Sequence, residues 1–152
     1  MKAEKLLVLP RVFIGLIFLV SVSYKLFTPS TAVVQMQGFV GRYGVTHGYE
    51  WYRGFLQGVV MPHVGLFGKL VVIGELYVGL GLLFGVTTRL AAGVGIFMLL
   101  NFMATKGAMP WNPSVCDPPD IVLCLVVLIG AAGRTLGVDR FLHERYPRIP
   151  IW

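Results

Sequence analysis

Residues 68–85 read GKLVVIGELYVGLGLLFG, an apolar stretch long enough to sit in a lipid bilayer, yet they include a glutamate, Glu75, near the centre. A charged side chain at mid-bilayer costs at least ~2.5 kcal/mol on insertion scales, so such residues face a protein interior, find a partner or serve a function. The stretch therefore predicts a membrane helix whose carboxylate is turned toward other parts of the protein.

The composition of the whole chain is that of an integral membrane protein. Of its 152 residues, 56% are hydrophobic and only 13% are charged, which is too apolar for a soluble domain of this size. The net charge of +6 does not indicate nucleic acid, because the basic residues flank apolar spans and so fit membrane lipid better. Cys116 and Cys124 form no CxxC pair and no zinc pattern, which argues against a thiol relay or a structural metal.

Four apolar stretches predict an all-α, four-helix membrane bundle that occupies residues 1–152 as a single domain. They are Leu6 to Phe27, Leu66 to Phe84, Leu90 to Met103 extending toward Thr105, and Ile121 to Leu136. The third helix is expected to begin near Thr88, so that the second and third form a tight hairpin at FGVTTR (84–89). Arg11 and Lys25 interrupt the first stretch, which favours a retained helix over a cleaved signal peptide.

The distribution of basic residues near the span ends predicts that both termini lie in the cytoplasm. In that orientation the inner basic residues are Lys2, Lys5, Arg11, Arg89, Arg134, Arg140, Arg145 and Arg148. The outer ones are fewer, namely Lys25, Arg42, Arg53, Lys69 and Lys106. We therefore expect a multi-pass protein of a prokaryotic cell membrane.

The first outer loop contains GYEWYRGFLQGVVMPHV (48–64), which has the pattern of an amphipathic interfacial helix ending at Pro62. Its apolar positions are Tyr52, Phe55, Leu56, Val59 and Val60. Its polar positions are Glu50, Arg53 and Gln57. Two interpretations remain open for this helix, of which packing on the rim of the bundle is favoured over a lid above a small-molecule site.

Polar side chains are expected to gather in the outer half of the bundle, where Glu75 lies ~13 Å deep. They are Lys25, Lys69, Glu75, Asn101 and Asp120. We rank Lys25 first as the partner of Glu75, ahead of Tyr24 and Lys69. Cys124 is expected to be a small core residue.

Helical periodicity predicts one interior face on each of three helices, with glycines that allow close backbone approach. On the first helix this face holds Arg11, Gly15, Phe18, Val22 and Lys25. On the second it holds Gly68, Glu75, Gly79 and Leu82, and on the fourth Asp120, Cys124, Val127, Ala131 and Arg134.

Each candidate residue also has a purely structural interpretation. Glu75 could satisfy a buried lysine or hydroxyl and fix helix register, or it could accept a proton or bind a head group. Lys25 could snorkel to the interface instead of contacting a ligand, and Asn101 could bridge two helices by hydrogen bonds. Asp120, after CDPP (116–119), is expected to be the N-cap of the fourth helix.

Three stretches together resemble the DoxX/DoxD family of four-helix membrane proteins: RVFIGLIFLVSVSYKLF (11–27), GELYVGLGLLFGVTTRLAAGVGIFMLLNF (74–102) and DIVLCLVVLIGAAGRTLGVDRFL (120–142). The interfacial WYRGFLQGVVMP (51–62) is more similar to the DoxD branch, the small subunit of thiosulfate:quinone oxidoreductase. The resemblance implies a four-helix bundle with quinone as a ligand and other membrane or outer-side subunits as partners.

In this interpretation Glu75 and Lys25 would be the catalytic pair, and the quinone would be bound by Tyr24, Lys69, Asn101 and Asp120. No haem or metal site is evident, since His47, His63 and His143 all lie outside the apolar spans. The alternative is a non-catalytic subunit that anchors a larger membrane complex. A small transporter is less favoured, because such folds normally contain internal repeats and none is visible.

Overall fold

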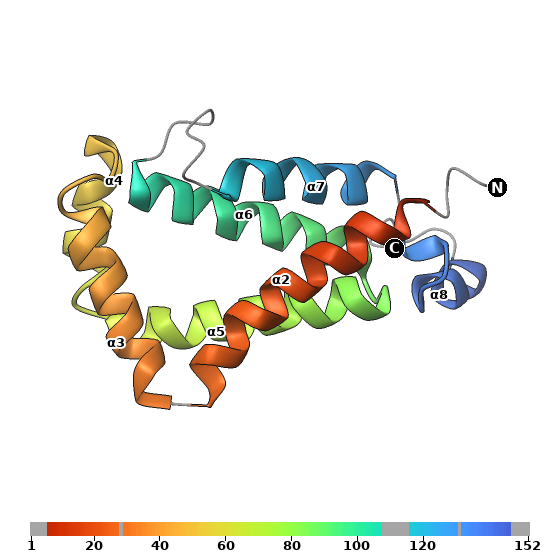
Figure 1. Cartoon of the computed structure of the whole chain (residues 1–152), viewed down its shortest axis with the longest axis horizontal. Helices are drawn as coiled ribbons and strands as arrows, with labels where there is room; N and C mark the ends of the chain where they lie inside the picture. The colour runs from red at the N-terminus through yellow and green to blue at the C-terminus, as the bar shows by residue number, and fades with distance from the viewer. Residues whose placement is uncertain (1–5, 28, 108–115, 131, 147–152) are drawn as a thin grey trace.

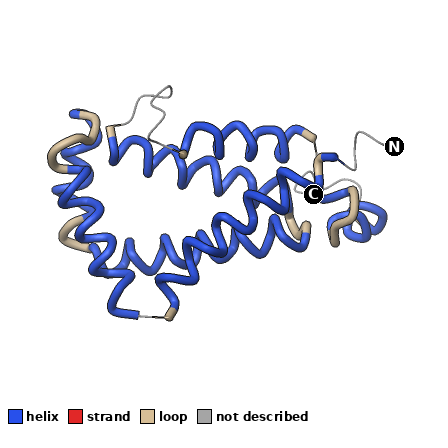
Figure 2. Tube along the Cα trace, viewed as in Figure 1, coloured by secondary structure: helices blue, strands red, loops and turns tan. Residues whose placement is uncertain are grey.

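The computed structural model describes residues 6–27, 29–107, 116–130 and 132–146, and this part of the chain is helical with short turns (Figures 1 and 2). Within it, three helices are long and apolar enough to cross a membrane: α2 (Val8–Leu26), α5 (Val64–Phe84) and α6 (Thr88–Lys106). The all-helical, multi-pass membrane class is therefore confirmed. Lys2, Lys5 and Arg148, which entered the charge count, and Ala131 lie outside the described residues.

The predicted fourth span is wrong in its extent. Helix α7 (Asp117–Ile129) has 13 residues, which is about 20 Å at 1.5 Å per residue against a hydrocarbon core of about 30 Å. It begins four residues before the expected start and ends well before Leu136. A 3₁₀ turn, η3 (Ala132–Arg134), and a short helix, α8 (Asp139–Arg145), follow it.

Helices α2, α5, α6 and α7 pack against one another, and α2 crosses α5 obliquely (Figure 1). The crossing is close because both helices contribute glycines: a methyl group on Gly15 would lie 2.9 Å from the backbone nitrogen of Leu83. The predicted interior faces of α2 and α5 are confirmed, since Arg11, Gly15, Phe18 and Val22 are buried, as are Gly68, Glu75, Gly79 and Leu82. On α7, Cys124 and Val127 are buried as predicted, but Arg134 lies beyond this helix, in η3, and is exposed.

The hairpin between α5 and α6 is confirmed at FGVTTR. Gly85 ends α5 in the left-handed region with φ of 67°, where glycine is the favoured residue. Thr87 also has a positive φ, of 47°, and α6 begins at Thr88 as expected. The two helices therefore reverse direction within three residues.

The segment between α2 and α5 forms two helical parts at one end of the molecule (Figure 1). The first, α3 (Pro29–Phe39), continues into the π-helical turn η1 (Val40–Gly44) and was not predicted. The second, α4 (Glu50–Phe55), continues into η2 (Leu56–Val60), so the expected helix is present, but Phe55 and Val59 of its predicted apolar face are exposed. Leu56 and Val60 are buried in a small core with Val40. This packing supports the rim interpretation of the helix, and α8 lies at the opposite end of the molecule.

Candidate ligand-binding site

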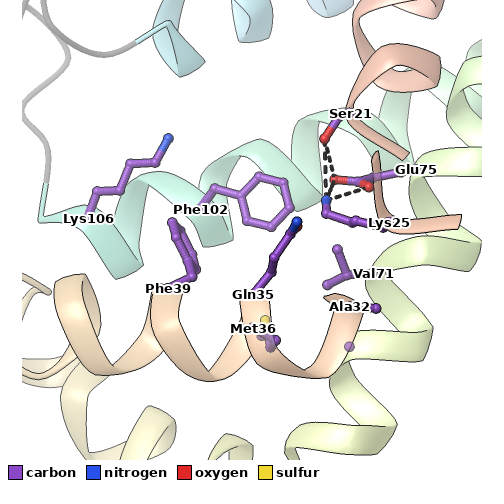
Figure 3. Close-up of a pocket in the computed structure, with 11 residues that line it drawn as sticks. Ser21, Lys25, Ala32, Gln35, Met36, Phe39, Val71, Glu75, Phe102 and Lys106 are labelled. Carbon is purple, nitrogen blue, oxygen red and sulfur yellow. Dashed lines mark hydrogen bonds and ion pairs between the residues drawn. The ribbon is translucent and has the colours of Figure 1, made fainter. Parts of the chain in front are cut away.

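Glu75 lies in the middle of α5 and is 2% exposed. The ammonium of Lys25 lies 2.5 Å from its Oε1 and 2.6 Å from its Oε2. Ser21, one turn before Lys25 on α2, donates a hydrogen bond to Oε1 at 3.0 Å and accepts one from Lys25 at 3.3 Å. These three side chains form the triad shown in Figure 3. The prediction that Glu75 contacts a basic or hydroxyl side chain, with Lys25 as first choice, is confirmed.

The triad forms one end of a pocket of about 300 Å³ between α2, α3, α5 and α6 (Figure 3). Its lining is mostly apolar and comprises Ser21, Lys25, Ala32, Gln35, Met36, Phe39, Gly68, Val71, Glu75, Phe102 and Lys106. The rings of Phe39 and Phe102 meet edge to face, with centroids 6.0 Å apart. The pocket therefore combines a buried ion pair with aromatic walls, a composition typical of small-molecule sites.

Helix α3 covers this pocket, and the sequence interpretation missed it. Ala32, Met36 and Phe39 recur at helical spacing and all line the cavity. That spacing was the available signal, but the segment is short and includes Gly38 and Gly41, which weaken any helix prediction. None of the residues of α4 lines the cavity. The cover over the site therefore comes from α3 and not from the helix for which a lid was considered.

Two of the predicted ligand-binding residues lie away from the pocket. Tyr24 is 70% exposed, Lys69 is exposed, and neither residue lines the cavity. Both side chains extend from their helices toward the surroundings of the protein. On α2, Ser21 and Lys25 face the pocket, so Tyr24 faces outward. On α5, Gly68 and Val71 face the pocket, so Lys69 faces outward.

Asn101 bridges two helices instead of lining the pocket. Its amide nitrogen donates to the Phe97 carbonyl at 2.7 Å, and its amide oxygen accepts a hydrogen bond from the Tyr52 hydroxyl. Burial raises the pKa of Tyr52, so its phenol stays protonated and remains the donor at neutral pH. Asn101 thus fastens α4 to α6 near the pocket, in agreement with its structural interpretation.

Asp120 is not the N-cap of the fourth helix, because α7 begins at Asp117. Pro118 and Pro119 fit inside the first turn, where a missing backbone N–H leaves no intrahelical bond unmade. The carboxylate that matters is Asp117, whose Oδ1 and Oδ2 lie 2.9 and 2.7 Å from the Lys106 ammonium. The sequence offered a signal for this ion pair, because an acidic residue is favoured at the start of a helix and a basic residue at its end, as Asp117 and Lys106 are on α7 and α6.

A second polar cluster lies at the other end of the molecule, and we call it the C-terminal clasp. Arg11 is 2% exposed and donates at 3.0 Å to the carbonyls of both Ala132 and Leu136. Asp139 is fully buried and accepts from the backbone N–H groups of Thr87 at 2.6 Å and Thr88 at 2.7 Å. Through these bonds Arg11 fastens the chain after α7 to α2. None of the residues of the clasp lines the pocket.

Neither of the two cysteines lines the pocket. Among the described residues there is no group of three His, Cys, Asp or Glu side chains placed to hold a metal ion. Cys116 is exposed, Cys124 is buried, and both are free thiols. The burial of Cys124 agrees with its expected place in the core.

Comparison with known proteins identifies a family model that matches the chain. The family model described as DoxX matches residues 6–108, which is more than half of the chain. The matched part includes α2 to α6 and with them every residue that lines the pocket. No match was found among curated proteins or among solved structures.

Proposed function

Because the chain belongs to the DoxX family, we propose that it is a membrane subunit that binds quinone in the pocket under α3 and takes part in quinone-linked electron transfer. The observation that carries the proposal is the buried Lys25–Glu75 pair, which opens on an apolar cavity with aromatic walls. A buried ion pair is weak evidence for stability by itself, and an ionisable pair within a membrane segment is a functional-site hypothesis.

The pocket suits the head group of a quinone in size and in lining. Its volume of about 300 Å³ is at the lower end of small-molecule sites, and Phe39 and Phe102 offer surfaces for a flat ring. A bound quinone would act as a two-electron carrier that takes up two protons when it is reduced. The electron donor that the DoxD resemblance implies is a sulfur oxyanion, which would act through an outer-side partner subunit.

Three side chains of this protein would do the local work. Lys25 would donate a hydrogen bond to a ring carbonyl by exchanging its longest contact, the 3.3 Å bond to Ser21. Glu75 would hold the ammonium in place, since both of its oxygens contact it. Because the pair is neutral overall, it can lie at this depth without leaving an isolated charge in an apolar pocket.

Quinone binding is expected to depend on this pair. In detergent, Lys25→Met should weaken binding of a short-chain 1,4-benzoquinone at least about tenfold, because the donor is lost. Glu75→Gln keeps the shape but not the counter-charge, and it should lower quinone reduction in membranes supplied with thiosulfate while the protein stays folded. Calorimetric titration and a membrane assay measure the two effects.

Lys69→Met provides the matched control, since it removes an exposed lysine from the helix that carries Glu75 without touching the pocket. It should bind quinone like the native protein. If Glu75→Gln leaves turnover unchanged and Lys25→Met leaves binding unchanged, an anchoring subunit becomes the better interpretation. One observation favours that alternative: both oxygens of Glu75 are already engaged by protein groups.

We further propose four membrane crossings with both termini in the cytoplasm. Helix α2 starts at the clasp end and reaches the pocket end, and the chain returns through α5 and crosses again through α6. It then leaves the pocket end at the Lys106–Asp117 pair and arrives at the clasp, where Arg11 binds the carbonyl of Ala132. Helix α7 with η3 would thus make the fourth crossing, and the excess of basic residues assigns the clasp end to the inside.

Cysteine labelling is expected to report this orientation. In a Cys116→Ser background, Arg42→Cys and Arg145→Cys replace two exposed residues at opposite ends of the molecule. A membrane-impermeant maleimide should modify position 42 in intact cells and position 145 only after permeabilisation. Labelling of position 145 in intact cells would contradict the proposed topology.

A further inference from the structure

Helix α8 is fixed at the level where a membrane helix ends. Two backbone N–H groups at its start donate to carbonyls at the end of α5, from Val138 to Phe84 at 3.3 Å and from Asp139 to Gly85 at 2.8 Å. The 21 residues of α5 extend over about 32 Å at 1.5 Å per residue, which matches a hydrocarbon core of about 30 Å. The start of α8 therefore lies at the boundary of the bilayer, beside the hairpin that joins α5 to α6 (Figure 1).

Helix α8 has three faces, because residues four apart lie above one another on a helix. One face is turned to the protein and comprises Asp139, which is fully buried, and His143, which is half-buried. A second face is exposed and polar, since the Arg140 guanidinium contacts the Glu144 carboxylate at 3.4 Å and both side chains are 65% exposed. The first face holds α8 against the bundle, and the second is suited to water.

The third face is mostly apolar, and we call it the apolar strip: it comprises Val138, Phe141 and Arg145, at spacings of three and four residues. Val138 is 42% and Phe141 is 70% exposed, and Leu136, just before the helix, is 69% exposed. Arg145 is exposed at the far end of the strip. Large apolar side chains are unfavourable in water, so a strip of them at the end of a membrane helix is suited to the boundary between head groups and acyl chains.

The exposed charge at this end of the molecule is mainly positive. Residues 84–89 and 132–146 include four exposed or half-exposed arginines against one exposed glutamate, and these are Arg89, Arg134, Arg140, Arg145 and Glu144. The other carboxylate of this segment, Asp139, is buried and accepts hydrogen bonds from the backbone of α6. An excess of arginines at a membrane surface complements anionic lipid, because negatively charged head groups attract basic side chains.

We propose that α8 is an interfacial helix that binds anionic phospholipid in the leaflet at the clasp end of the protein. Val138 and Phe141 lie against the upper acyl chains, and Arg145 donates to a lipid phosphate, which its planar guanidinium fits well. An isolated helix of seven residues is unstable in water, but Asp139 fixes this helix on the bundle, so lipid binding does not have to order it. No residue of α8 lines the pocket, so the proposal is independent of quinone binding.

Fluorescence quenching in nanodiscs that contain phosphatidylglycerol measures which face of α8 meets lipid. In a Cys116→Ser background, which leaves the buried Cys124 as the remaining thiol, Phe141→Cys and Arg140→Cys place the same maleimide fluorophore on two neighbouring exposed positions. The label at position 141 should be quenched mainly by a nitroxide on the upper acyl chain, and the label at position 140 mainly by iodide in water. If iodide quenches both labels equally, α8 does not lie in the interface. If neither agent reaches position 141, a second copy of the chain covers the apolar strip, and the lipid proposal is equally wrong.

The preference for phosphatidylglycerol over phosphatidylcholine tests the role of Arg145, with bound lipids counted by native mass spectrometry of the full chain in detergent. Arg145→Gln should weaken phosphatidylglycerol binding about fivefold, the loss that corresponds to one basic group near an anionic surface. Arg140→Gln is the matched control, because it removes the same charge from the polar face, and at one helix diameter from the strip it should weaken binding less than about twofold. Equal losses in the two variants, or a native protein that binds both lipids alike, would contradict the proposal and leave the proposed function untouched.

Discussion

Glu75→Ala is expected to destabilise the protein by about 3–5 kcal/mol, the range seen when one partner of a buried ion pair is removed. The substitution leaves the Lys25 ammonium, 17% exposed, with only the Ser21 hydroxyl as a partner. It also removes the acceptor of the Ser21 hydrogen bond. Thermal and SDS-induced unfolding in detergent measure the loss, and a large fall in the unfolding midpoint is the expected result.

The double variant Lys25→Met/Glu75→Leu separates charge from packing. It replaces the whole pair with apolar side chains of similar length, and such replacements are often neutral or stabilising in a buried site. We therefore expect it to unfold within about 1 kcal/mol of the native protein while failing to bind quinone. A Glu75→Ala protein as stable as the native one would mean that the pair is not buried in the folded protein.

Local patterns in the sequence were enough to predict Lys25 as a partner of Glu75, but they did not identify Ser21. The helical repeat of 3.6 residues determines which face of each helix carries Glu75 and Lys25. The glycines on the same faces allow the two helices to approach closely along them. The structure confirms this face on α2 and α5 and the pair that joins them. The Lys25–Glu75 pair was thus predicted correctly, whereas Tyr24 and Lys69 on the same two helices lie outside the pocket.

Residues whose role depends on distant parts of the chain were not predicted. Arg11 was expected on the interior face of the first helix, but the carbonyl groups that it binds, 121 and 125 residues further along the chain, were not predicted. The pair between Lys106 and Asp117 joins two helices across residues 107–116, so no helical period marks it. Helix α3 is short and includes a glycine, Gly38, and tertiary contacts with α5 and η2 compensate for its low propensity.

The fourth helix was placed wrongly for a related reason. Hydropathy continues from Ile121 to Leu136, so the pattern favours one long span. In the structure the helix ends at Ile129 because the following segment gives its carbonyl groups to Arg11 instead of to the next helical turn. A buried cation that binds several backbone carbonyls competes directly with helix formation, and hydropathy does not register that competition.

The second large effect is expected at the C-terminal clasp, where Asp139→Ala should destabilise the protein by about 3 kcal/mol or more. The fully buried carboxylate accepts two short hydrogen bonds from the backbone at the start of α6, so it caps a helix that is far from it in sequence. Charge-assisted bonds of this kind contribute about 1.5–3 kcal/mol each, and both N–H groups would be left without their acceptor. The loss would also remove a negative charge that interacts with the buried guanidinium of Arg11.

Glu144→Ala is the matched control, because Glu144 is an acidic residue of the same helix whose side chain is 65% exposed and whose contact with Arg140 is equally exposed. An exposed pair of this kind contributes little, so the control should unfold within about 0.5 kcal/mol of the native protein. Gly133→Ala should reproduce the effect of Asp139→Ala, because a methyl group there would collide with the Asp139 carboxylate and the Thr88 hydroxyl. Thermal unfolding in detergent measures all three. If Asp139→Ala and Glu144→Ala unfold at the same temperature, α8 does not fasten the start of α6, and the clasp has no role in the stability of the bundle.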